Sequence, residues 1–177
     1  MRLIRLSLEN WRGVTARDIE FDQSVTLIEG PNEIGKSTIV EALQMLFKEL
    51  DSSKRREVKA IKPVDKDVGS RVEVEISAAD YHFIYAKTYN KAPQTTLEFL
   101  APSRQQLTGR EAHERVEQVL EESVDMTLWD ALLIDQGEKV GLANLQNSAG
   151  LARALDEAAG STGSSDDPNL SEDGSLY

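Results

Sequence analysis

The chain has 177 residues, enough for one well-packed domain, and its 40% hydrophobic and 29% charged content is ordinary for a globular protein. The absence of cysteine excludes disulfides and thiolate metal sites, and the sequence has neither a signal-peptide core nor an apolar run long enough for a membrane span. Because neither a signal peptide nor a membrane span is found, we expect a cytoplasmic protein with no membrane contact, which is compatible with association with the nucleoid. The net charge of −11 argues against a general nucleic-acid binder.

The first third of the chain predicts three strands and a helix. Alternating apolar residues indicate strands at 2–10 and 17–22. The more continuously apolar segment 24–30 predicts a strand buried on both faces. A helix with one apolar stripe begins at Lys36. The polar residues 51–70 include proline and glycine, so we expect a loop there.

The middle of the chain predicts an antiparallel meander followed by a helix. Residues 71–77 alternate strictly, and 81–90 follow after a short turn, as in a hairpin. Residues 95–102 give a third strand, and 108–123 have a helical pattern. The expected fold is therefore an α/β lobe that contains an antiparallel β-meander.

The C-terminal part of the chain changes in composition. Residues 128–138 are apolar, and 148–160 are rich in Ala and Leu and predict a helix. Residues 161–177 are rich in Ser, Gly and Asp, with too few apolar side chains to offset the entropy of ordering. We therefore expect a domain at 1–160 and a disordered tail or linker at 161–177.

A glycine-rich turn between the expected strand 24–30 and the following helix matches the pattern G-x-x-x-x-G-K-[ST]. In this pattern a loop of backbone N–H groups ahead of a helix N-terminus binds phosphate. Gly30 lets the chain turn, and Gly35 lets backbone approach the ligand closely. Lys36 would reach the β- and γ-phosphates of ATP, Ser37 would bind Mg²⁺, and Thr38 would contact the α-phosphate region.

The loop "GPNEIGKST", the helix start "IVEAL" and two other segments resemble a known family. They are similar to the SMC-like branch of ABC-type ATPases, which includes chromosome-maintenance proteins, SbcC-type break-repair ATPases and RecF-type recombination proteins. In "LSLENWRGV", Arg12 matches an arginine that lies against the nucleotide in the family. In "LLIDQGE", Gln136 matches a glutamine that contacts magnesium and the attacking water. The closest resemblance is to the break-repair branch.

The resemblance implies a set of site residues and partners. Lys36 and Gln136 would be catalytic, Ser37 and Gln136 would hold Mg²⁺, and the loop residues Asn32, Glu33 and Ile34 would contact ATP. Ile34 departs from the usual small residue at a variable position. In the family the N-terminal lobe is completed by a C-terminal lobe beyond a coiled coil, and two heads sandwich ATP. No signature motif or Asp-Glu-ended strand follows Gln136.

The resemblance therefore implies an incomplete ATPase head, the N-terminal lobe, that binds ATP but cannot hydrolyse it alone. Its implied partners are the C-terminal lobe of the same protein and a second head. The parent protein would act on DNA in repair or chromosome maintenance, with a nuclease as a further partner. These partners rest on the resemblance, because the acidic balance of the chain does not support a DNA contact.

A basic cluster, "KRREVKAIK" at 54–62, has two interpretations. It is either a solvated loop or a contact to phosphate, with Lys62 as a further nucleotide-binding candidate. His82 and His113 lack a second histidine at ligand spacing, so neither predicts a metal site. Two alternatives to the ATPase remain open. One is a P-loop kinase of a small metabolite that uses the cluster as a lid, and the other is a nucleotide-gated interaction module.

Overall fold

The computed structural model of the protein describes residues 1–31 and 35–123. The chain divides into two compact units, 1–124 and 125–177. The second unit lies outside the described residues, as do the predicted helix at 148–160, the predicted domain boundary at residue 160 and the predicted disordered tail. These three remain predictions.

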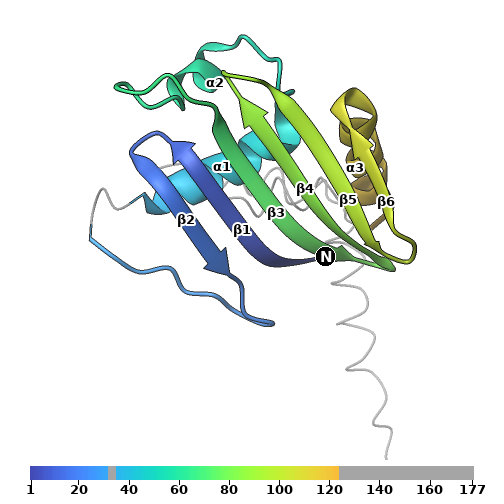
Figure 1. The fold of residues 1–177 in the computed structure, drawn as a ribbon. Helices are drawn as coiled ribbons and strands as arrows, with labels where there is room; N and C mark the ends of the chain where they lie inside the picture. Colours follow the sequence, from blue (N-terminus) through green and yellow to red (C-terminus); the bar gives the residue numbers. More distant parts are fainter. Residues whose placement is uncertain (32–34, 124–177) are drawn as a thin grey trace, which may run out of the picture. The chain divides into compact units, whose positions relative to one another are not determined.

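The first unit is built on one open, six-stranded sheet in which all neighbouring strands are antiparallel (Figure 1). The strand order is β2-β1-β3-β4-β5-β6. The predicted meander is confirmed as β3, β4 and β5, while the short β6 was not predicted. The strands are β1 (Arg2–Trp11), β2 (Val14–Glu20), β3 (Ser70–Ala78), β4 (Tyr81–Tyr89), β5 (Gln94–Ala101) and β6 (Gln105–Thr108).

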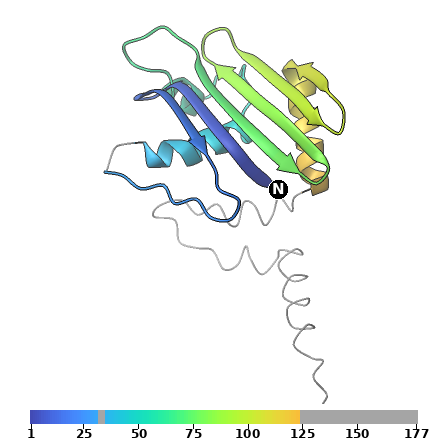
Figure 2. The same cartoon turned by 60° about the horizontal axis from the view of Figure 1, so that its bottom comes forward.

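Two helices lie against the same face of this sheet (Figures 1 and 2). They are α1 (Lys36–Lys48), which follows the glycine-rich turn, and α3 (Gly109–Ser123). Both were predicted. The loop predicted at 51–70 is wrong in part, because it contains the short helix α2 (Arg56–Ala60). This helix forms because Val58 and the following Ile61 are fully buried in the core.

The core lies between the two helices and the inner face of the sheet. Val72, Val74 and Ile76 of β3 are fully buried, as their alternation predicts. Leu6 and Leu8 of β1 pair with Val74 and Val72, so these apolar side chains form continuous rows across the strands. Each such side chain contributes roughly 1.5–3 kcal/mol when fully buried. This layer fixes where α1, and therefore the glycine-rich turn, can lie.

The outer face of the sheet carries a network of charged side chains. Arg5 of β1 pairs with Glu73 at 3.2 Å and with Glu75 at 3.8 Å. Glu73 also pairs with Arg71 at 2.7 Å, and Glu75 lies 2.8 Å from His82 on β4. Arg5 on β1 therefore meets opposite charges on the neighbouring β3, which stabilises the pairing modestly on a half-exposed face.

The predicted strand at 24–30 is wrong for this structure. The segment is not part of any strand, and its apolar side chains Val25 and Leu27 are 79% and 77% exposed. An apolar strand is stable only when neighbouring strands satisfy its backbone and other layers cover its faces. Within 1–31 and 35–123 no strand pairs with this segment, and Val25 and Leu27 stay exposed, whereas Ile28 is half-buried.

Candidate functional site

The first turn of α1 is arranged as an open helix N-terminus. Gly35 is the N-cap residue, with a left-handed backbone (φ 91°), and none of the side chains at 1–31 and 35–123 caps this end. The first turn contains no acidic residue that would repel an anion. Because the first N–H groups of a helix have no partners within the helix, this end presents donors and a partial positive charge to a ligand. The arrangement suits a phosphate group.

Lys36 closes the glycine-rich turn on itself. Its Nζ donates hydrogen bonds to the carbonyl oxygens of Gly30, at 2.6 Å, and Pro31, at 2.7 Å. The lysine that was predicted to bind phosphate therefore lies over the first part of its own loop, which brings the two ends of the motif together. The predicted ligand-binding residues Asn32, Glu33 and Ile34 lie outside the described residues and remain predictions.

Gly35 lies in tight contact with the turn between β1 and β2. A Cβ atom added at this glycine would stand 3.3 Å from Cγ2 of Val14 and 3.6 Å from Oγ1 of Thr38. The glycine is therefore needed both for its positive φ and for its close approach. A cavity of about 360 Å³ opens at this contact. It is lined by Gly13, Val14, Thr15, Ala16, Arg17, Gly35 and Thr38.

Arg12 occupies the two-residue turn that joins β1 to β2. Its backbone is left-handed, with φ of 52°, a conformation that costs an L-residue roughly 1–2 kcal/mol. Two contacts hold it there. The preceding Trp11 is fully buried and meets Tyr89 edge-to-face at 5.9 Å, and the Arg12 N–H donates to the Ile61 carbonyl at 2.6 Å.

The Arg12 side chain lies against α1 through Glu41. Nε donates to one carboxylate oxygen at 2.8 Å and Nη2 donates to the other, in a bidentate pair. The hydrogen bond from Arg12 to Glu41 raises the pKa of Arg12 further above its ordinary value. The structure therefore brings Arg12 beside the helix that begins at Lys36, and its contact with a nucleotide remains a prediction. Two of its five N–H groups are used by Glu41, which leaves others to meet a ligand.

Lys62 lies in a different surface hollow. It pairs with Asp67 at 2.6 Å, and Lys91 pairs with the same carboxylate at 2.8 Å. Hydrogen bonds from the two lysines, Lys62 first, lower the pKa of Asp67 to about 2. Lys62 does not line the cavity at Gly35, although its neighbour Ile61 bonds the backbone of Arg12. The hollow has about 410 Å³ and is lined by Lys59, Lys62, Pro63, Val64, Asp65, Lys66 and Asp67.

The predicted metal ligands are Ser37 and Gln136. Ser37 lies in the first turn of α1, where a hydroxyl can face a ligand held by the loop. Gln136 lies outside the described residues, so its role remains a prediction. In the part of the chain that the structure describes, no three His, Asp or Glu side chains gather in a way that could hold a metal ion.

Sequence reasoning missed two features of this region. Glu41, which holds Arg12, stands in the motif "IVEAL", five residues after Lys36. The sequence does place this single acidic residue in an otherwise apolar helix segment, which could have indicated a partner of opposite charge. The second feature is a buried polar cluster around Lys87 at the far end of α1. Its signal is the alternation of β4, which places Lys87 on the inward-facing side.

The family of the chain follows from a comparison with known proteins. The family described as AAA domain matches residues 5–139, which is most of the chain. The chain therefore belongs to this family of ATPase domains. The matched range includes the glycine-rich turn, Arg12 and Gln136.

Similar sequences in two mycobacteria carry no assigned function. Uncharacterized proteins from Mycobacterium bovis and Mycobacterium tuberculosis are each 49% identical over 161 residues, or 90% of this chain. The chain spans only 18% of the length of each of these relatives.

Two solved structures are similar in part. An SMC head domain from Thermotoga maritima is 24% identical, with a TM-score of 0.41 over 59% of this chain and 39% of the other. The recombination mediator RecF bound to ATP is 16% identical, with a TM-score of 0.45 over 90% of this chain and 53% of the other. Among the described residues, none of the helices has the length and apolar content required to cross a membrane.

Proposed function

We propose that this chain is the ATP-binding N-terminal segment of an SMC-like ATPase. The observation that carries the proposal is the uncapped start of α1, with Lys36 folded over the loop and Gly35 packed against Val14. Such a helix start offers several donors at once to an anion. A triphosphate supplies the charge that this end of the helix favours. Membership of an ATPase domain family supports the same ligand.

Lys36 would exchange partners when ATP binds. Its ammonium now donates to two neutral carbonyl oxygens, whereas phosphate oxygens carry charge and form stronger hydrogen bonds. The side chain would therefore turn from its own loop to the β- and γ-phosphates. Ser37 and Gln136 would hold Mg²⁺, which would neutralise charge on the leaving γ-phosphoryl group. Arg12, fixed by Glu41, would contribute a further positive charge beside the nucleotide.

The same proposal assigns a role to the exposed apolar segment at 24–30. We infer that the C-terminal lobe of the full-length protein covers it, because Val25 and Leu27 have no cover within 1–31 and 35–123. Hydrolysis would need that lobe and a second ATPase head. In the parent protein we propose a cytoplasmic role in DNA repair or chromosome maintenance, with DNA and a nuclease among the partners.

Nucleotide binding by the full-length protein tests this function. In the Lys36→Ala variant we expect the Kd for ATP to rise at least ~100-fold, because several charge-assisted hydrogen bonds are lost. The matched control is Arg110→Ala, which removes one exposed positive charge from α3. Isothermal titration calorimetry would measure both variants. Unchanged ATP affinity in Lys36→Ala would overturn the assignment of the loop.

Hydrolysis by the 177-residue chain alone provides a second arm of the same test. We expect its turnover to stay at background, because the proposed site lacks the residues that the second lobe would supply. Turnover above ~1 s⁻¹, within the usual range of enzymes, would contradict the need for that lobe. Phosphoryl transfer to a small metabolite would instead favour the kinase interpretation.

A further inference from the structure

Lys87 of β4 is a lysine with no solvent exposure. It lies on the inner face of the sheet, paired with Val72 of β3 on one side and Thr95 of β5 on the other. Lysine is almost never fully buried without partners, because desolvation of an ammonium is costly. Burial lowers the pKa of Lys87 to about 8, which leaves most of the side chain protonated at neutral pH. Such a group must be compensated by specific contacts.

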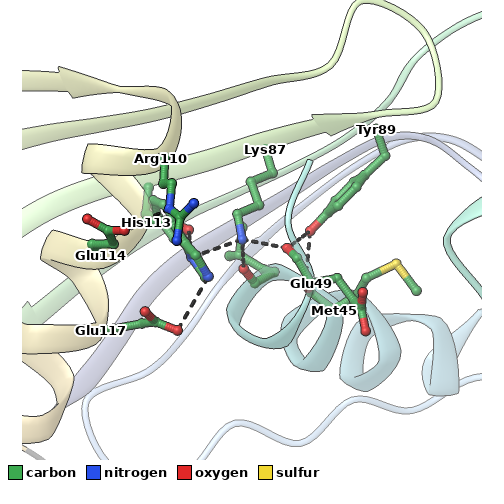
Figure 3. Close-up of polar contacts among 10 residues, drawn as sticks. Met45, Glu49, Lys87, Tyr89, Arg110, His113, Glu114 and Glu117 are labelled. Atoms are coloured by element: carbon green, nitrogen blue, oxygen red, sulfur yellow. Dashed lines mark hydrogen bonds and ion pairs between the residues drawn. The ribbon is translucent and has the colours of Figure 1, made fainter. Parts of the chain in front are cut away.

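The compensating contacts lie at the C-terminal end of α1 (Figure 3). The Nζ of Lys87 donates to the carbonyl oxygen of Leu46 at 2.8 Å and to that of Glu49 at 2.6 Å. Its third N–H group meets Nδ1 of His113 on α3 at 3.2 Å. All three donors of the ammonium are therefore used. A positive charge at a helix C-terminus also interacts favourably with the helix dipole.

Tyr89 adds to the same end of α1. Its hydroxyl lies 2.9 Å from the carbonyl oxygen of Met45 and 3.3 Å from that of Glu49, and donates toward them. The last carbonyl groups of a helix have no partner within it and usually meet water. In this protein Lys87 bonds the carbonyl of Leu46 and that of the C-cap residue Glu49, and Tyr89 bonds the carbonyl of Met45, which also accepts the Glu49 N–H at 2.9 Å. The end of α1 is therefore attached to the sheet by buried polar contacts.

The cluster also includes α3. His113 is almost fully buried, and its Nδ1 lies 2.8 Å from the hydroxyl of Tyr85. Its Nε2 lies 3.4 Å from the carboxylate of Glu117. Burial, and then the charge of Lys87, lower the pKa of His113. The ring is therefore neutral at pH 7, with Nδ1 as acceptor and Nε2–H directed at Glu117.

We propose that Lys87 is a positioning residue for the phosphate-binding loop. This role rests on the proposed ATP binding at the start of α1. Helix α1 has 13 residues, so its two ends are ~20 Å apart and move as one rigid body. Lys36 and Ser37 stand at the first end, and Lys87 holds the other. The buried ammonium therefore sets where the loop's donors meet the phosphates.

A general contribution to stability does not explain this lysine well. An apolar side chain of similar length would pack among Tyr85, Tyr89 and Val72 without the cost of burying a charge. The contacts that offset that cost are made to the end of α1 and to α3, and not within the sheet. Geometry at the helix end is what the lysine supplies and an apolar residue would not.

The test compares two destabilised variants of the full-length protein. Lys87→Met removes the three donors and keeps an unbranched side chain. Leu97→Ala removes core contacts on the neighbouring β5, where Leu97 is equally buried but apolar, so it has no polar side-chain group to bond α1. Calorimetry measures the Kd for ATP at a temperature where circular dichroism shows both variants folded. Hydrogen exchange of the amides at 39–42, the first in α1 that have acceptors within the helix, reports on the loop end of the helix without nucleotide.

We expect Lys87→Met to raise the Kd for ATP about tenfold, since misplacement by ~1 Å can cost up to ~100-fold. It should also speed exchange at 39–42, whereas Leu97→Ala should change neither quantity more than about twofold. Wild-type affinity and exchange in Lys87→Met, or equal losses in both variants, would overturn the proposal. If the wild-type protein does not bind ATP, the proposed function fails first.

A milder variant keeps the proposal testable if Lys87→Met does not fold. Tyr89→Phe removes one hydroxyl from the same helix end and leaves the aromatic contact with Trp11. We expect a rise of about two- to threefold in the Kd for ATP, with faster exchange at 39–42. The paired variant Tyr85→Phe removes a hydroxyl that bonds His113 on α3. An equal effect in both tyrosine variants, or none in Tyr89→Phe, would contradict the positioning role.

Discussion

The two ends of helix α1 differ in how their backbone groups are satisfied. At the C-terminal end, Lys87 and Tyr89 bond the carbonyls of Met45, Leu46 and Glu49 within the protein core. At the N-terminal end no side chain among the described residues provides a cap, although such a cap is typically worth ~1 kcal/mol. We call the C-terminal end of α1, whose carbonyl groups are bonded by side chains, the closed end, and the N-terminal end, which begins at Gly35 and Lys36, the open end. An open end on a firmly held helix is what preorganised anion binding requires.

The difference also separates two kinds of consequence. Changes at the open end should alter ligand binding more than folding, because the groups there await a partner. Changes at the closed end should alter folding and, through the helix, binding as well. Substitutions at each end, each with a matched control, test whether effects on binding and effects on folding are separated in this way.

The largest effect is expected from Gly35→Val at the open end. A β-branched residue there must adopt a φ of 91°, and its Cβ would stand 3.3 Å from Val14. The loop must therefore shift. We expect the Kd for ATP to rise at least ~100-fold, because the donors no longer match the phosphates. Calorimetry measures the affinity, and circular dichroism should still show a folded sheet and helix.

Gly13→Ala is the matched control for this change. Gly13 lines the same cavity, but an added Cβ would meet nothing within 4 Å. The substitution should therefore change the Kd less than about threefold. If Gly13→Ala and Gly35→Val weakened binding equally, the effect would lie in the cavity wall and not in the geometry of the loop.

We expect His113, which belongs to the polar cluster at the closed end, to make the free energy of unfolding depend on pH. Because the pKa of His113 is lowered in the folded protein, the unfolded chain takes up a proton near pH 6.5 that the folded chain does not. The free energy of unfolding should therefore be fully developed above pH 6.5 and fall as the pH drops below it. The charged and titratable groups that act on the ring or bond it are Lys87 and Tyr85 of β4, Glu114 and Glu117 of α3, and Asp51 after α1.

Urea unfolding of the 177-residue chain between pH 7 and pH 5 measures this effect. We expect the wild type to lose more free energy of unfolding than His113→Gln across this range, because only the wild type carries the histidine whose pKa is lowered in the folded protein. The two proteins should show the same slope between pH 7 and pH 8. Parallel curves throughout would show that His113 does not carry the acid sensitivity of the closed end.

The sequence predicted the sheet well where local patterns and long-range packing agree. In β3, strict alternation puts Val72, Val74 and Ile76 on one face, and the structure buries all three. The helix after the glycine-rich turn was also predicted, since its apolar stripe packs on that face. Strand β3 and helix α1 need only each other's apolar faces to pack against, and the described residues provide both faces.

The failures arise where partners decide the outcome. The segment 24–30 has the pattern of a buried strand, but the described residues supply no neighbouring strand for it. Helix α2 has five residues, and it depends on the burial of Val58, which no local pattern reveals. Lys87 faces the core on β4, as Tyr85 and Tyr89 do. Lysine is rarely fully buried, so the burial of Lys87 was not predicted. Its role became visible only with the end of α1 beside it.

The smallest effect is expected from Arg12→Lys. Arg12 lies in the turn beside the open end of α1 and is paired with Glu41 on that helix. An exposed ion pair is worth ~0–1 kcal/mol, and the side chains of Arg12 and Glu41 are 46% and 30% exposed. The free energy of unfolding should therefore change by less than ~1 kcal/mol. Lysine keeps the charge but cannot form the bidentate pair with Glu41 or offer further fixed donors to a phosphate. We expect the Kd for ATP to rise about three- to fivefold.

Arg17→Lys is the control for this exchange, because Arg17 lines the cavity at Gly35 from β2, where it stands opposite Leu8 of β1. Calorimetry and urea unfolding should be run on both variants in parallel. A large loss of stability in Arg12→Lys would mean that the pair of Arg12 and Glu41 stabilises the fold. The open end would then contribute to folding, as the closed end does. A change in affinity without a change in stability would instead show that Glu41 holds Arg12 for the ligand, so that the contrast between the two ends extends to the turn beside the loop.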